Sequence, residues 1–179
     1  MRNQSQKLVQ AALFAALTAV GAFIRFPLGA ASFTLQFLFT ALAGVVLGPK
    51  WGAVSQGVYV ALGLVGLPVF TQGGGIGYLL QPSFGFLLGL IPAAAVIGAL
   101  AGEKGRPQQV IPACLVGLAV LYVVGVPYMG VVLNLYLEKG MGTWALIKTG
   151  MLIYLPGDAV KIAVVTAAAP SLCRRLKRS

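Results

Sequence analysis

The stretch FGFLLGLIPAAAVIGALA, residues 84–101, contains no charged side chain and approaches the roughly 20 apolar residues that a helix needs to span a bilayer. Similar apolar runs lie on either side of it, at residues 8–24, 33–47, 51–70, 110–137 and 144–172. These runs are rich in Ala, Gly and Leu and lack the alternation of a membrane β-strand. The sequence therefore predicts an all-α integral membrane protein, a bundle of six transmembrane helices.

The composition supports this class, because 59% of the 179 residues are hydrophobic and 9% are charged, too few charges for a water-facing surface. The run at 33–47 is short for a span, and the outer end of the run at 110–137 is expected to leave the bilayer. The first run also follows the order of a signal peptide, but Arg25 and Pro27 stand where a small-residue cleavage site would be needed. We expect it to remain as the first helix. The loops are brief, so residues 1–179 are expected to form a single domain.

The basic residues predict the orientation of the bundle. With both termini in the cytoplasm, the inner side carries nine of the thirteen Lys and Arg residues, in accord with the positive-inside rule: Arg2, Lys7, Lys50, Lys104, Arg106, Arg174, Arg175, Lys177 and Arg178. We therefore predict an N-in, C-in topology. The net charge of +10 gathers at membrane boundaries and not along a soluble face. It therefore predicts contact with anionic lipid and not with nucleic acid.

The residue types present exclude several kinds of chemistry. The chain has no histidine and three acidic residues, and its two cysteines, Cys114 and Cys173, fall near predicted cytoplasmic helix ends. We therefore expect no metal site, no disulfide framework and no serine–histidine or multi-carboxylate catalysis. The Gly-Lys-Ser/Thr ending of a nucleotide-binding loop does not occur in the chain. The protein is not expected to be an enzyme.

The stretch LPGDAVK, residues 155–161, places an acid and a base inside an apolar run. Asp158 and Lys161 lie 16 and 13 residues before Arg174, about 24 and 20 Å into a core about 30 Å thick, toward the outside. Each buried charge costs on the order of 3 kcal/mol at such depth. Pro156 and Gly157 are expected to loosen the helix and free backbone groups for a cavity, water or ligand. The two charges form either a pocket for a ligand that carries N–H groups and an anion, or an intrahelical ion pair that fixes the bundle.

Other polar residues are also predicted to lie near the outer side of the membrane. Thr34 and Gln36 open the second run, and Asn134 and Tyr136 lie near the outer end of the fifth. Each is a candidate ligand contact, or else forms a hydrogen bond between helices. Hydrogen bonds between helices are also expected of three polar residues along the third run: Ser55, Gln56 and Tyr59.

The outer loop FTQGGGIGYLLQP, residues 70–82, is a further candidate for ligand contact. Its glycines, Gly74 among them, allow backbone to approach a ligand closely next to Phe70. A flexible connection between helices is the alternative. The loop is a weak candidate for phosphate binding, because it lacks the strand, turn and helix of a nucleotide-binding loop.

Several motifs together resemble one family. They are FTLQ at 33–36, LGPKWG at 47–52, GLPVF at 66–70, and PGD at 156–158 with Lys161. In this order they resemble the BioY family of biotin transporters, over nearly the whole chain. The resemblance implies the substrate-binding (S) component of an energy-coupling factor (ECF) transporter in the cell membrane, which captures biotin at its outer face. A membrane T subunit and a pair of ATP-hydrolysing subunits would drive release into the cytoplasm, and biotin would be the transported ligand, with no cofactor.

The resemblance also implies roles for individual residues. Asp158 would accept hydrogen bonds from the ureido group of biotin, and Lys161 would pair with its carboxylate. The segment QPSFGF at 81–86 departs from the GPTGGY usual in the family, so no contact is assigned there. The complete set of predicted ligand-binding residues is Asp158, Lys161, Gln36, Thr34, Phe70, Gly74, Asn134 and Tyr136.

The resemblance also implies that small residues on the first helix form a docking face for the T subunit. Ala11, Ala15 and Ala19 form a small-xxx-small stripe, with Ala12 and Ala16 beside it, that would let another helix approach closely. Packing against the protein's own helices is the alternative. For the whole chain, the alternatives to biotin capture are a ligand-free membrane scaffold and an S component for another small vitamin.

Overall fold

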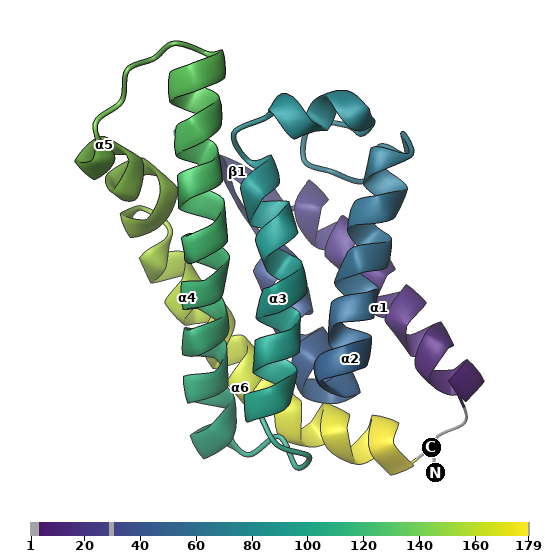
Figure 1. Cartoon of the computed structure of the whole chain (residues 1–179). Helices are drawn as coiled ribbons and strands as arrows, with labels where there is room; N and C mark the ends of the chain where they lie inside the picture. The colour runs from purple at the N-terminus through teal and green to yellow at the C-terminus, as the bar shows by residue number, and fades with distance from the viewer. Residues whose placement is uncertain (1–3, 29–30, 179) are drawn as a thin grey trace.

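The computed structural model describes residues 4–28 and 31–178, so the predicted inner-side residue Arg2 lies outside the described part of the chain. Helices make up most of it (Figure 1). The elements in chain order are α1 (Gln4–Phe23), β1 (Arg25–Leu28), β2 (Ala31–Thr34), α2 (Gln36–Leu64), η1 (Ile76–Leu80), α3 (Phe84–Leu100), α4 (Pro107–Val131), η2 (Val132–Tyr136), α5 (Thr143–Ile147), η3 (Lys148–Leu152) and α6 (Leu155–Arg178).

Several helices are long and apolar enough to cross a membrane, as the composition predicts. Within the described residues, four segments meet this standard by length and hydropathy: Gln4–Phe23, Gln36–Leu64, Pro107–Tyr136 and Thr143–Arg175. The shorter apolar helix α3 lies between α2 and α4 and packs against both (Figure 1). Large apolar side chains, such as Val123 at 72% exposure and Leu135 at 78%, point away from the bundle. Such surfaces suit lipid better than water.

Helix α2 holds two of the predicted apolar runs and turns back on itself between them. Gly48 adopts φ 82°, a conformation that favours glycine, and Pro49 follows it. On either side of this bend, the Gln36 amide donates to the Tyr59 hydroxyl at 2.8 Å and the Thr40 hydroxyl donates to the Gln56 side chain at 2.9 Å. Thr40 lies after Gln36 in the chain, but its partner Gln56 lies before Tyr59. The halves of α2 are therefore antiparallel.

A buried polar network ties α1 to both halves of α2. The amide nitrogen of Gln56 donates to the hydroxyls of Thr18 at 3.3 Å and Ser55 at 3.2 Å, while its oxygen accepts from Thr40. Gln56 and Thr18 are fully buried. These polar residues therefore form hydrogen bonds between helices, as the sequence predicts for Ser55 and Gln56.

The all-α expectation is wrong for the segment between α1 and α2. Strands β1 and β2 form an antiparallel hairpin in which Arg25 pairs with Thr34 and Phe26 with Phe33. Pro27 lacks a backbone N–H and cannot continue a helix, which explains why the chain leaves α1 here. Phe33 and Thr34 therefore lie in a strand, and α2 begins at Gln36.

The last apolar run is also broken rather than continuous. The π-helical segment η3 ends at Leu152, and α6 starts at Leu155. Pro156 lies in the first turn of α6, where its missing N–H costs no hydrogen bond. The irregularity that Pro156 and Gly157 predict is therefore present, but it falls just before them. Asp158 consequently lies in the first turn of a new helix.

Candidate ligand-binding cavity

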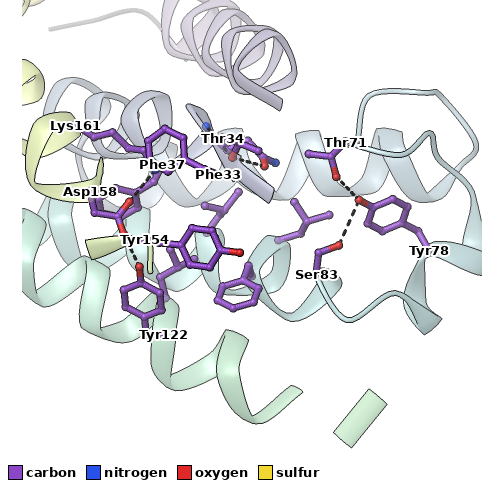
Figure 2. Close-up of a pocket in the computed structure, with 15 residues that line it drawn as sticks. Phe33, Thr34, Phe37, Thr71, Tyr78, Ser83, Tyr122, Tyr154, Asp158 and Lys161 are labelled. Carbon is purple, nitrogen blue, oxygen red and sulfur yellow. Dashed lines mark hydrogen bonds and ion pairs between the residues drawn. The ribbon is translucent and has the colours of Figure 1, made fainter. Parts of the chain in front are cut away.

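A cavity of about 90 Å³ lies beside the β-hairpin, enclosed by segments far apart in the sequence. Its walls come from β2, α2, the loop before α3, and helices α3, α4 and α6, together with Tyr154 just before α6. The lining residues are Phe33, Thr34, Gln36, Phe37, Thr71, Tyr78, Ser83, Phe86, Leu87, Leu90, Leu121, Tyr122, Tyr154, Asp158 and Lys161 (Figure 2).

One end of the cavity carries both intramembrane charges. The Lys161 ammonium lies 2.7 Å from Oδ1 of Asp158, and the two residues are 6% and 3% exposed. The Tyr122 hydroxyl of α4 donates to the other carboxylate oxygen. The predicted intrahelical ion pair is therefore present, and the same pair faces a cavity. A carboxylate offers about four acceptor sites, so Asp158 keeps capacity for a further donor.

The hairpin covers this charged end through Phe33. Its ring centroid lies 4.1 Å from the Lys161 ammonium, which is a cation–π contact. A Cβ atom placed on Gly157 would lie 2.0 Å from Cε2 of Phe33. The ring therefore rests directly on the backbone of α6, and glycine at position 157 makes this approach possible.

Hydroxyl groups line the opposite end (Figure 2). The hydroxyls of Thr71 and Tyr78 are 2.7 Å apart, and the Ser83 hydroxyl donates to that of Tyr78 at 3.5 Å. Arg25 of β1 donates to the backbone carbonyl of Thr71, which joins the hairpin to the loop at residues 70–82. Apolar and aromatic side chains also line the cavity, among them Phe37, Phe86, Leu87 and Leu90.

Half of the predicted ligand-binding residues reach the cavity. Asp158, Lys161, Thr34 and Gln36 line it, and the Thr34 hydroxyl donates to the Gln36 side chain at 2.8 Å. Gln36 in turn donates to Tyr59, so its amide is held between β2 and α2.

The other four predicted residues lie away from the cavity. Phe70 is fully buried behind Tyr78, with ring centroids 4.6 Å apart. Gly74 packs tightly within the loop at residues 70–82, where an added Cβ would lie 2.1 Å from the Leu67 carbonyl oxygen. Asn134 binds the backbone of Met141 through both of its amide atoms, at 2.9 and 2.7 Å, and Tyr136 is 57% exposed. These residues shape loops rather than the cavity.

Sequence reasoning missed several residues that line the cavity. Tyr122 meets Asp158 only in the folded chain, because it comes from another helix, whereas Tyr154 stands one helical turn before Asp158 in the sequence. Ser83 and Phe86 fall in the segment left without an assignment. Thr71 and Tyr78 belong to the glycine-rich loop, whose polar side chains rather than its glycines reach the cavity.

The alanine stripe on α1 mostly faces the protein's own interior. Ala11 and Ala15 are 1% and 3% exposed, and Ala19 is half-buried against the core. Ala12 and Ala16, next to this stripe on the helix, are exposed. Because a buried alanine cannot meet a partner helix, the expectation that Ala11 and Ala15 form a docking face does not fit this structure.

A bundle of apolar helices around a cavity with charged and hydroxyl ends is typical of a membrane protein that binds a small solute. Among the described residues, no group of three or more His, Cys, Asp or Glu side chains could hold a metal ion. A family model described as the BioY family matches residues 1–178, and the chain belongs to this family.

Relatives and a solved structure agree with this assignment. The chain is 54% identical over 141 residues to the probable biotin transporter BioY of Lysinibacillus sphaericus, covering 77% of this chain and 72% of that protein. It is 38% identical over 165 residues to the biotin transporter BioY of Thermotoga maritima, covering 92% and 94%. A crystal structure of the S-component for biotin from an ECF-type ABC transporter superposes with a TM-score of 0.82, at 25% identity, covering 98% of this chain and 96% of that one.

Proposed function

We propose that this protein captures biotin at the outer face of the cell membrane and serves as the S component of an ECF-type transporter. The observation that carries this proposal is the buried Asp158–Lys161 pair facing a cavity, in a chain whose relatives are named biotin transporters. The members of this family bind and transport a substrate and are not enzymes. The halves of α2 count as separate spans, which gives six crossings with both termini in the cytoplasm.

The chemistry of biotin suits the two ends and the middle of this cavity. A ureido ring offers N–H donors and a carbonyl acceptor, a pentanoate chain ends in a carboxylate, and the thioether ring and methylenes between them are apolar. The cavity places a carboxylate with an ammonium at one end, hydroxyls at the other, and aromatic and aliphatic side chains between. Few precisely placed polar groups within an apolar wall are typical of small-molecule sites.

Binding of labelled biotin to the purified protein in detergent or nanodiscs tests the proposal. We expect saturable binding, and at a biotin concentration 100 times Kd a stabilisation of about 2.7 kcal/mol, seen as a higher melting temperature. Thiamine and folate serve as control vitamins and should leave the melting curve unchanged. A flat response to biotin would favour the ligand-free scaffold, and a response to a control vitamin would favour a different S component.

A T subunit and a pair of ATPase subunits are the proposed partners, and the exposed side of α1 is the proposed docking face. Ala12 and Ala16 lie one turn apart on that side. Ala16→Trp is therefore expected to reduce copurification of a coexpressed T subunit by about tenfold, since the indole blocks close helix approach. Biotin binding should stay unchanged, because Ala16 does not line the cavity.

A matched control separates docking from a general effect of added bulk. Val123 is 72% exposed on α4, so Val123→Trp also places an indole on an apolar surface. The control is expected to copurify the T subunit as the wild type does. Equal recovery with the Ala16 and Val123 variants would reject this face of α1.

A further inference from the structure

One end of the bundle is built from segments that pack directly on one another. The loop between α3 and α4 lies on α6, because a Cβ atom added to Gly105 would lie 2.9 Å from Sγ of Cys173. The Cys173 thiol in turn donates to the backbone carbonyl of Val45 in α2 at 3.8 Å. A Cβ atom added to Gly98, near the end of α3, would lie 2.5 Å from the backbone of Gly48 at the bend of α2. These segments therefore form one continuous surface, with the last turns of α6 running beneath α2 and α3 (Figure 1).

Exposed cations gather on this surface, the basic end: Lys50, Lys104, Arg106, Arg174 and Arg175. Of the three acidic residues in the chain, Glu103 lies here. Among the described residues, no acidic side chain forms an ion pair with Lys50, Lys104, Arg106 or Arg174. The basic end therefore has an excess of positive charge that its own side chains do not neutralise.

The opposite end of the bundle is less charged. Its exposed cations within the described chain are Arg25, Lys139 and Lys148, and Glu138 stands next to Lys139. Arg25 is already held by the Thr71 carbonyl. The asymmetry favours an anionic partner at the basic end alone.

Apolar surface borders the cations of the loop between α3 and α4. Leu100, which ends α3, is 49% exposed, and Ile111 and Leu115 on α4 are 43% and 54% exposed. Lys104 and Arg106 come between them in the chain. A ligand that matches both features is amphiphilic, with an anionic group at the level of the loop and apolar chains along the helices.

The end of α6 adds the pattern of an interfacial helix. Leu172 and Cys173 pack on the core, whereas Arg174 and Arg175 are exposed. Helical segments with one apolar face and basic residues on the other lie at the membrane surface and are attracted to anionic lipids. Guanidinium groups suit a phosphate because they can donate two parallel hydrogen bonds to it.

We propose that the basic end binds anionic phospholipid, with headgroup phosphates on its exposed cations and acyl chains on the neighbouring apolar surface of α3 and α4. Under the topology proposed above, these lipids belong to the cytoplasmic leaflet. The site goes beyond biotin capture and does not depend on it, because none of the cations of the basic end lines the cavity.

The two tryptophans of the chain stand at opposite ends and provide an internal comparison. Trp51 follows Lys50 and packs partly against the core, and Trp144 is 69% exposed on α5. Trp144→Phe leaves Trp51 as the fluorophore at the basic end, and Trp51→Phe leaves Trp144. Each variant is placed in vesicles of phosphatidylcholine and phosphatidylglycerol in equal amounts, with bromine on the acyl chains of one lipid and then of the other. Quenching by each brominated lipid measures how often that lipid lies beside the tryptophan.

We expect phosphatidylglycerol to be enriched over phosphatidylcholine by at least about threefold at Trp51 and by less than about 1.5-fold at Trp144. In the Trp144→Phe background, Lys50→Gln/Arg174→Gln should reduce the enrichment at Trp51 at least about twofold, because each cation contributes to the attraction. Lys139→Gln/Lys148→Gln is the matched control, since it removes the same charge from the opposite end, and it should leave the enrichment at Trp51 unchanged.

Equal quenching of Trp51 by the two brominated lipids would overturn the proposal and leave the basic end to an acidic surface of a protein partner. An undiminished enrichment in Lys50→Gln/Arg174→Gln, or an equal loss in the control, would also overturn it, because these cations would then not be the cause. Melting curves identify misfolded variants, and the single changes Lys50→Gln and Arg174→Gln then give the same comparison. Titration with biotin on the same samples keeps the proposals distinguishable, since lipid enrichment is measured without biotin and the variants at the basic end should bind it as the wild type does.

Discussion

Lys161→Met is expected to lower both the stability and the biotin affinity of the protein by a large factor. The substitution leaves the Asp158 carboxylate 3% exposed with no ammonium at 2.7 Å. Breaking a buried ion pair by removing one partner costs about 3–5 kcal/mol, which for a chain of this size lowers the melting temperature by on the order of 10 °C. Thermal unfolding without ligand measures the loss of stability, and titration with biotin measures the loss of binding.

The doubly neutral variant Asp158→Asn/Lys161→Met separates the structural role of the pair from its role in binding. Removing both charges together leaves no buried charge unpaired, so stability should return close to that of wild type. Biotin binding should not return. Asp158→Asn alone is expected to weaken binding by about 1.5–3 kcal/mol, roughly ten- to a hundredfold, because an amide exchanges a charged acceptor for a group that brings its own donors. Recovery of both stability and affinity in the double variant would contradict a binding role for the pair.

The membrane class and the charged site were predictable because each depends on local sequence. An uncharged run of the length of 84–101 has few alternatives to a buried or membrane helix, and an acid with a base in such a run needs a partner or a ligand. The bend at Gly48 also follows from a local signal, since the Gly-Pro step separates two apolar runs.

The missed features depend on contacts between distant segments. Tyr122 reaches Asp158 from another helix, and Thr71, Tyr78 and Ser83 meet through the path of a loop, so no spacing in the sequence indicates them. The hairpin at β1 and β2 is short and lies mostly between the predicted apolar runs at 8–24 and 33–47, so neither run indicates it. The side of α1 that faces the core is set by packing. Ala11 and Ala15 fit the helical period as well as Ala12 and Ala16 do, so the sequence does not show which pair is buried.

Gly157→Ala is the other substitution for which we expect a large effect, and simple helix propensity predicts the opposite sign. In a helix interior, alanine is favoured over glycine by up to about 1 kcal/mol. At position 157, however, the new Cβ would lie 2.0 Å from the ring of Phe33, far inside van der Waals contact. The ring, which covers Lys161, must move. We therefore expect biotin affinity to fall by about tenfold or more, as read by titration.

Two comparisons decide whether the clash with Phe33 is the cause. Gly57→Ala is the matched control, because an added Cβ on this helical glycine meets nothing within 4 Å, and it should leave affinity unchanged. Phe33→Leu removes the ring atoms that the new methyl group would strike. If the clash is responsible, adding Gly157→Ala to Phe33→Leu should cost little further affinity, since residues in contact do not act additively. An equal loss of affinity in both backgrounds would instead mean that position 157 acts through the backbone of α6, and the covering role of Phe33 would have to be abandoned.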